Sequence, residues 1–476
     1  YGSAAPAVFV AGDEPDRLAR AWIRGLQGTD STPSRLAYPS DRVARLLVAS
    51  AHPDNPNPPL LREDLPWWRR LLDVLPQLSE AVANSTATVH RWLLFGFGPD
   101  CGAQARVMNA ALAGWVRAVA APLLRTGSTI NLFLAGDEES LPSLIAQARF
   151  LLTPAADWVS GQVFAARGSA WAESSYLLPA PGVVAQELVS SHQEAAVAAA
   201  PLAALLASPS SAGALVTGAG RGLGREVALA FARRHAGVAA FDIAVTNLAS
   251  ANTSSLPYPP ATAEDLEQTA KQVEAAGGRA LPMRGNVLSP AALGEALETT
   301  HRHFGHVDAV VVCSGLVATS GPSGTAGREI LETNLIGAVQ TARFAYPYLR
   351  ESGGTLVLVA ADVGLRGAAP LRAAGRQTGD ANSHAGHDLG AYAAASHAIV
   401  ALGHELAAGR YGESVRVQVV CPAALAAPAH VEPALAVPSA GGRALLPPAD
   451  VAELIVRLCF MPELQGSSLL VDGLGI

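Results

Sequence analysis

The chain has 476 residues, of which 50% are hydrophobic and 15% are charged, and its formal net charge is −7. This length predicts two or three domains, and the composition is typical of buried parallel sheets, which excludes a disordered chain. The negative charge without a basic run excludes nucleic acid as the main partner, and no run of about 20 apolar residues is present to span a membrane.

The first 168 residues have the pattern of a small α/β domain. No glycine-rich loop follows its first expected strand, so we expect this part to bind no nucleotide and to serve packing, dimerisation or partner docking. The expected strands are Ala7–Gly12, Val43–Ala49, Val89–Phe95 and Thr129–Leu134, and the expected helices are Ala103–Leu124 and Ile145–Leu152.

Residues 169–211 are rich in alanine, serine and proline and are expected to link two halves of the chain. The alanine-rich run Glu194–Ala207 within them is short and contains Pro201, so it is interpreted as a helical linker and not as a membrane span.

The second half alternates short apolar runs with helical patterns, which predicts a parallel sheet with right-handed crossovers. Its expected strands are Ala214–Thr217, Val238–Asp242, Val307–Cys313, Gly354–Ala360, Val415–Cys421 and Ser467–Val471. Its expected helices are Arg225–Arg234, Ala263–Ala276, Ala391–Ala408 and Asp450–Phe460.

The first half repeats the tail of the second. The small-residue helix expected at Ala103–Leu124 and its following strand match those at Ala391–Ala408 and Val415–Cys421, and WVSGQVF within 157–167 matches ELQGSSLLVDG at 463–473. The fold class expected is therefore α/β, with two doubly wound Rossmann-like parallel-sheet domains in tandem. The first, 1–168, is shortened and degenerate, 169–211 is the linker, and 212–476 is the complete copy.

The run Thr-Gly-Ala-Gly-Arg-Gly-Leu-Gly at 217–224 follows an expected strand and precedes a helix, the context of a dinucleotide-binding loop. Gly218 permits the sharp turn, Gly222 lets the backbone approach the pyrophosphate, and Gly224 lets the helix pack closely. The alternative is a glycine-rich turn that has lost its cofactor. The expected cofactor contacts in this loop are Thr217, Gly218, Gly220, Arg221, Gly222, Leu223 and Gly224.

Asp242 ends the second strand of this half, about 20 residues after the loop, where a carboxylate accepts hydrogen bonds from the adenosine ribose. Because a carboxylate repels a 2′-phosphate, NAD(H) is favoured over NADP(H). Arg221 argues for NADP(H), since it could pair with that phosphate, and Asp242 could instead be a plain helix or turn cap.

The loop TGAGRGLGR, the N-L-I-G at 334–337, Tyr392 followed by A-A-A-S-H-A, and L-L-V-D-G near the C-terminus together resemble the short-chain dehydrogenase/reductases. The similarity covers residues 212–476. The tandem layout is similar to that of high-molecular-weight 3-oxoacyl-(acyl-carrier-protein) reductases, and E-A-A-G-G-R-A-L at 274–281 is similar to the hydroxyacyl-CoA dehydrogenase units of peroxisomal multifunctional enzymes.

The resemblance implies a catalytic set of Asn, Ser, Tyr and Lys, of which Asn334 and Tyr392 are present. Ser396 stands at the lysine position and Ala361 at the serine position. The family lysine binds the nicotinamide ribose and lowers the tyrosine pKa, so without it we expect Tyr392 to stay neutral, a competent acid and a poor base. The single lysine of the chain, Lys271, lies in the helix after the second strand of this half and cannot substitute.

The same resemblance assigns further cofactor contacts. Asn286 and Val287 are expected near the adenine, with Asn286 in place of the family's acid. Cys-Ser-Gly at 313–315 replaces Asn-Ala-Gly, and Pro422 follows the sixth strand. The additional expected cofactor-binding residues are Asn286, Val287, Ser314, Gly315, Ser396 and Pro422.

About 30 residues separate Ala361 from Tyr392, where the family spends about a dozen, and they include His384 and His387. This insertion could be a lid whose histidines donate a proton, or a solvated loop without chemistry. Two histidines are too few for a metal site, so none is predicted. His397, next to the lysine position, is expected to pack or to face solvent.

These features predict an atypical NAD(P)H-dependent ketoreductase, acting on an acyl-thioester or polyketide-like ketone in bacterial biosynthesis. The alternatives are a nucleotide-binding pseudoenzyme that scaffolds an active reductase, and a non-redox cyclase, dehydratase or isomerase that reuses the pocket. A homodimer through the tyrosine-bearing helices is the expected assembly. With no signal-peptide or membrane pattern, the cytoplasm is the expected location.

Overall fold

The computed structural model describes a set of segments, and the structural statements below concern these alone. They are residues 7–12, 17–27, 42–50, 66–83, 89–96, 102–135, 141–152, 156, 159–165, 212–246, 260–316, 324–361, 385–409, 411–423, 425, 446–460 and 468–471. The expected linker, and with it the helix expected at Glu194–Ala207, lies outside them.

The chain forms two compact units, each containing one sheet. Unit 1 consists of Tyr1–Leu177, Ser320–Leu331 and Gly367–Ala401, and unit 2 of Leu178–Thr319, Glu332–Arg366 and Leu402–Ile476. Unit 1 therefore includes a short helix and most of a long helix from the second half of the sequence. The domain boundaries expected at 168 and 211 stay predictions.

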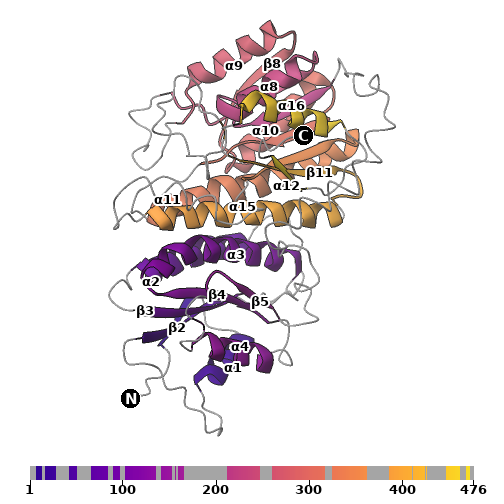
Figure 1. The fold of residues 1–476 in the computed structure, drawn as a ribbon. Coiled ribbons are helices and arrows are strands. Elements are labelled where there is room, and N and C mark those ends of the chain that lie inside the picture. Colours follow the sequence, from indigo (N-terminus) through magenta and orange to yellow (C-terminus); the bar gives the residue numbers. More distant parts are fainter. Residues whose placement is uncertain are drawn as a thin grey trace, which may run out of the picture. The chain divides into compact units, whose positions relative to one another are not determined.

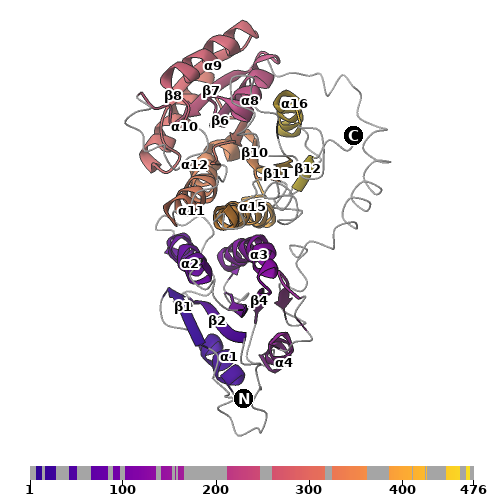
Figure 2. The ribbon, with the colours of Figure 1, turned by 60° about the vertical axis from the view of Figure 1, so that its left-hand side comes forward.

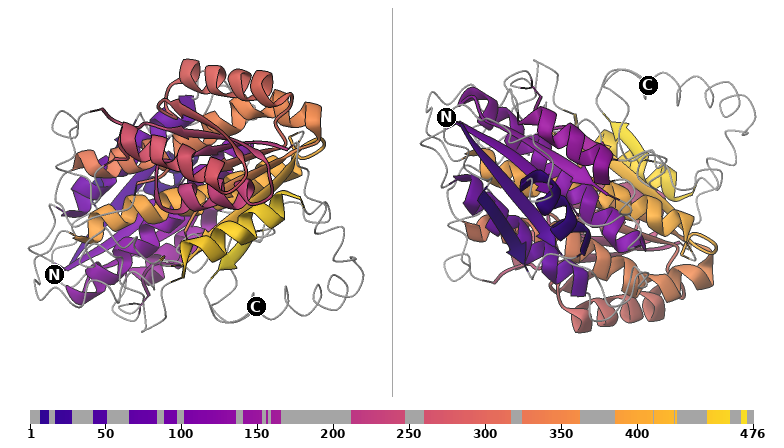
Figure 3. Two further views of the ribbon diagram at one scale, coloured as in Figure 1. Left: turned by 90° about the horizontal axis from the view of Figure 1, so that it is seen from above. Right: turned by 90° about the horizontal axis from the view of Figure 1, so that it is seen from below.

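Unit 1 has a five-stranded parallel sheet in the order β1-β2-β3-β4-β5, and Figure 3 shows strands of this sheet side by side. The four strands expected from the apolar runs are confirmed, and a short fifth strand follows them. The strands are β1 (Ala7–Gly12), β2 (Arg42–Ser50), β3 (Val89–Phe95), β4 (Thr129–Leu134) and β5 (Val163–Ala165).

Helices cover both faces of this sheet (Figure 1). On one face, Trp22 and Leu144 join a core with Phe95 and Phe133 of the strands. On the other face lies α3, which extends the expected helix by one residue at each end. The helices of the first half are α1 (Arg17–Gln27), α2 (Pro66–Ala83), α3 (Gly102–Arg125) and α4 (Leu141–Leu151).

Unit 2 has a seven-stranded, all-parallel sheet in the order β12-β11-β10-β9-β6-β7-β8. The expected doubly wound α/β fold is confirmed. The strand order reverses at β6, which pairs with both β7 and β9, and such a switch point opens a ligand crevice beyond the carboxyl ends of the strands. The strands are β6 (Gly213–Thr217), β7 (Gly237–Asp242), β8 (Arg279–Arg284), β9 (Ala309–Val312), β10 (Thr355–Val359), β11 (Arg416–Pro422) and β12 (Ser468–Val471).

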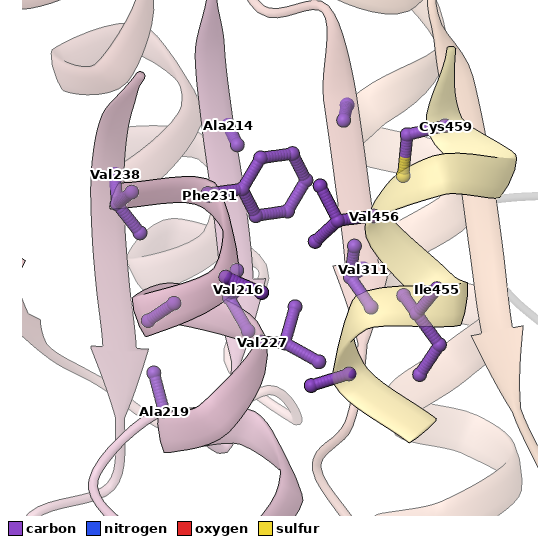
Figure 4. Packing of buried hydrophobic residues seen from close by; sticks show 14 of the residues in the cluster. Ala214, Val216, Ala219, Val227, Phe231, Val238, Val311, Ile455, Val456 and Cys459 are labelled. Atoms are coloured by element: carbon purple, nitrogen blue, oxygen red, sulfur yellow. The ribbon is translucent and has the colours of Figure 1, made fainter. Parts of the chain in front are cut away.

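One face of this sheet packs against α8 and α16, and Figure 4 shows Val227 and Phe231 of α8 and Val456 of α16 meeting over Val216 and Val311 of the strands. The helices of the second half are α8 (Gly222–Ala232), α9 (Ala263–Ala275), α10 (Pro290–Phe304), α11 (Gly324–Ile330), α12 (Gly337–Ser352), α15 (Ala385–Ala408) and α16 (Pro448–Cys459), with a π-helical turn at Leu331–Ile336.

Three helices begin at least three residues earlier than the sequence predicts. Helix α4 starts at Leu141 and not at Ile145. Helix α8 starts at Gly222 and not at Arg225, so the end of the glycine loop is already the first turn of the helix. Helix α15 starts at Ala385 and not at Ala391, so the last residues of the insertion are helical. Among the described residues, no helix is both long and apolar enough to cross a membrane.

Candidate functional site

The glycine loop leaves the carboxyl end of β6 as a tight turn. Gly218 has a φ of +67°, and a Cβ on it would lie 2.9 Å from the backbone nitrogen of Ser314. A Cβ on Gly224 would collide with the carbonyl oxygen of Gly218. The loop therefore requires glycine at both positions, one for the turn and one for the close approach of α8.

Gly222 differs from these two. Its φ is +57°, and a Cβ built on it would meet nothing within 4 Å. Arg221 is the N-cap residue of α8 and makes no side-chain cap, so the cap adds no side-chain acceptor to the first turn of this helix. A glycine with open space above it, at the N-terminus of a helix, leaves room for a phosphate to approach the backbone.

Asp242, the last residue of β7, holds the loop in place. It is 8% exposed, its Oδ2 accepts a hydrogen bond from the Gly220 N–H at 2.8 Å, and its Oδ1 accepts one from the Ala244 N–H at 3.2 Å. Burial raises the pKa of this carboxyl, and the two N–H groups and the charge of Arg221 oppose that rise. The carboxylate is thus an anchor of the loop.

A second anchor was not predicted. Arg225 of α8 donates from Nη2 to the Gly220 carbonyl at 2.5 Å and to the Asp265 carbonyl at 3.1 Å, while its Nε donates to Thr269 Oγ1 at 3.0 Å. Thr269 also donates to the Gly220 carbonyl at 3.2 Å. Asp242 and Arg225 therefore hold both backbone polar groups of one loop residue, the N–H and the carbonyl of Gly220. The only sequence signal for Arg225 is its place directly after the last glycine of the loop.

The residues after β9 contact the end of β6, where the glycine loop begins. The Ser314 N–H donates to Thr217 Oγ1 at 3.2 Å, which joins the ends of β9 and β6. The amide of Asn334 is paired on both sides with Leu316, accepting from its N–H at 2.7 Å and donating to its carbonyl at 2.9 Å. Gly315 lies beside it, since a Cβ there would be 3.4 Å from Asn334 Oδ1.

Asn334 lies within the π-helical turn Leu331–Ile336. The other expected cofactor residues are placed as follows. Asn286 is exposed and accepts from the Leu288 N–H at 2.9 Å, Val287 is buried, Pro422 is the last residue of β11, and Leu223 packs against the core of unit 2.

Helix α15 carries Tyr392, which is half-buried, and Ser396, which is 3% exposed. Ala361, at the position of the family serine, is buried. Lys271 is exposed on α9. The position on α15 where the resemblance implies a lysine therefore carries Ser396. The position after β10 where it implies a serine carries Ala361.

The side chains of the two insertion histidines, His384 and His387, are not among those that the structure describes. His384 lies outside the described residues, and of His387 only its place in the first turns of α15 is described. His397, in contrast, is 5% exposed, so of the two expectations for it, packing is the correct one.

Comparison with known proteins gives the family. Residues 260–373 match the family described as short chain dehydrogenase. An uncharacterized oxidoreductase of Mycobacterium tuberculosis is 35% identical over 218 residues, which are 45% of this chain and 72% of that protein. The chain belongs to the short-chain dehydrogenase/reductase family. This membership assigns it to the oxidoreductases, as the sequence predicted.

Two further family members are similar to this chain. An uncharacterized NAD-dependent oxidoreductase of Mycobacterium tuberculosis is 32% identical over 227 residues, 46% of this chain and 73% of that protein. The (-)-trans-carveol dehydrogenase of Rhodococcus erythropolis is 31% identical over 216 residues, 44% of this chain and 69% of that protein.

Proposed function

We propose that the chain is an atypical NAD(H)-dependent ketoreductase whose substrate is a ketone on an acyl thioester or polyketide-like chain in bacterial biosynthesis. The observation that carries the proposal is the loop at 217–224, where Gly222 faces open space and side chains outside the loop or at its end hold both the N–H and the carbonyl of Gly220. A loop held in this way is preorganised for a pyrophosphate.

The chemistry is divided between cofactor and chain. A bound reduced nicotinamide supplies hydride to the carbonyl carbon. Tyr392 supplies a proton to the developing alkoxide oxygen, and as a neutral phenol it can do so without a neighbouring cation. With alanine at Ala361, one hydrogen-bond donor to the carbonyl is missing. Loss of such a donor costs about 100- to 1,000-fold in other enzymes, so we expect slow turnover.

The first test is titration of the full chain with NADH and NADPH, followed by a panel of ketones including β-ketoacyl thioesters. Saturable NADH binding with ketone-dependent oxidation of NADH supports the proposal. Absence of binding of either nucleotide contradicts it.

Cofactor choice gives a second prediction. Asp242→Asn keeps an oxygen acceptor for the Gly220 N–H but removes the negative charge, so the affinity for NADPH relative to NADH should rise by about 10-fold, equivalent to about 1.4 kcal/mol. Asp308→Asn is the matched control, since Asp308 Oδ2 accepts from the Gly213 N–H at 2.8 Å, at the opposite end of β6. The affinity of Asp308→Asn for NADPH relative to NADH should equal that of the unchanged chain. An unchanged ratio in Asp242→Asn would assign the carboxylate to loop anchoring alone.

Stoichiometry gives a third prediction. β1 is followed by Asp-Glu-Pro-Asp at 13–16, which offers no glycine and repels phosphate. Calorimetric titration of the full chain should therefore give one nucleotide per chain. Two equivalents would show that the first half also binds.

The second candidate function is a nucleotide-binding pseudoenzyme that scaffolds an active reductase. It is favoured by Ser396 and Ala361, because both replace catalytic side chains and neither restores the charge or the hydroxyl that is lost. The same titrations separate the candidates: NADH binding without turnover of any ketone supports the scaffold.

A further inference from the structure

Two long helices of unit 1 are buried on nearly all sides. In α3, Ala105, Met108, Leu112 and Val116 are buried, and so are residues on the other sides of the helix, such as Trp115. In α15 every described side chain from residue 393 to 402 is buried. A helix that is apolar all round needs a neighbour on both sides, and the sheet of unit 1 covers only one side of α3.

The second neighbour of each helix is the other helix. A Cβ on Gly114 of α3 would lie 2.6 Å from the Ala393 carbonyl oxygen of α15, and a Cβ on Gly390 of α15 would lie 2.8 Å from Cδ1 of Trp115. Each helix thus carries a glycine where the other approaches. Figure 2 shows α3 beside α15 and α2 beside α11.

A network of hydrogen bonds between α3 and α15 fixes the position of one helix along the other. Arg117 Nη1 of α3 lies 3.2 Å from His397 Nε2, and His397 Nδ1 lies 3.0 Å from the Ala393 carbonyl. Because arginine can only donate, Nε2 accepts and Nδ1 carries the proton. Burial, together with the charge of Arg117, lowers the pKa of His397 to about 3, so this ring stays neutral beside the guanidinium.

The pairing joins elements that correspond to each other in the order of helices and strands along the two halves of the sequence. α3 connects β3 to β4 as α15 connects β10 to β11, and α2 precedes β3 as α11 and α12 precede β10. α3 contacts α15, and α2 contacts α11, with Arg328 and Asp73 paired at 3.1 Å. Contacts between corresponding elements are typical of a two-fold symmetric dimer interface, in which both subunits use the same surface.

We infer that the chain contains its own dimer: α2 and α3 stand in for a second copy and cover the face of α11 and α15 within the same chain. The first half, which lacks the nucleotide loop, thus has a role as a built-in subunit that supports the helix carrying Tyr392. The sequence led us to expect a homodimer through the tyrosine-bearing helices. If α2 and α3 cover these helices, any homodimer has to form through another surface.

The direct test is a cross-link between Asp73 and Arg328, both about half exposed. The full chain carrying Asp73→Cys and Arg328→Cys is treated with a short bismaleimide, beside both single variants and the unchanged chain as controls for the native cysteines. A linked product that migrates as one chain on a denaturing gel supports the inference. A product of two chains, or no product specific to the double variant, overturns it.

A matched pair of glycines tests the packing independently. Gly114→Ala and Gly294→Ala both improve helix propensity, but a Cβ on Gly294 meets only Phe344 at 3.7 Å, an ordinary contact. Gly114→Ala should lower Tm by about 2–4 °C, and Gly294→Ala should leave it unchanged or raise it. Equal effects of the two changes would contradict a close approach of α3 to α15 in solution.

Discussion

Gly222→Ala is expected to weaken NADH binding by about 100-fold, equivalent to about 2.8 kcal/mol. A Cβ at this position points into the open space over the first turn of α8, since no atom of the described chain lies within 4 Å of it. That space is where the pyrophosphate must approach the backbone, so the added methyl and the phosphate compete for it. Isothermal titration with NADH measures the loss.

The control for this change is Gly353→Ala. Gly353 has a φ of +62° and likewise no atom within 4 Å of a built Cβ, but it caps the C-terminus of α12. Both variants carry the same strain of a left-handed alanine, about 1–2 kcal/mol, and only Gly222→Ala should lose affinity. Equal affinities in the two variants would show that the open space at Gly222 is not the phosphate site.

Tyr392→Phe is expected to lower the rate of ketone reduction by about 100-fold or more, the range attributed to a positioned general acid. The change removes only the hydroxyl that donates the proton. Tyr348→Phe, the same change on α12, should leave the rate unaltered. If Tyr392→Phe reduces ketones at the original rate, the proton has another source, and His384 and His387 of the insertion become the candidates to replace.

Ser396→Lys restores a cation at the position where the family resemblance implies a lysine. A lysine at this position should lower the pKa of Tyr392 and so help alcohol oxidation, which needs a base, more than reduction, which needs an acid. Because Ser396 is buried, Ser396→Met is the control that adds similar bulk without charge. Both directions share one equilibrium constant, so the useful measurement is the pH–rate profile of each. A profile of oxidation that does not move to lower pH in Ser396→Lys contradicts the prediction.

Local patterns were sufficient for much of the fold. The strands from β1 to β4, and β6 and β7, follow from short apolar runs, because a strand buried on both faces has few polar residues. The glycine loop was predictable for the same reason: its conformation depends on residues adjacent in sequence. Strand β8 was missed because it lies at the edge of its sheet, where several of its side chains are exposed, so no apolar run marks it.

The sequence by itself thus determined the two parallel sheets, the glycine loop and the family, and it placed Ser396 and Ala361 where the family resemblance implies lysine and serine. Only the tertiary structure decided how these parts are held. Arg225 meets Thr269 across 44 residues, Asn334 meets Leu316 across 18, and Arg117 meets His397 across 280. Each contact depends on how distant segments pack, and no local periodicity in one segment specifies the side chain that it will meet in another.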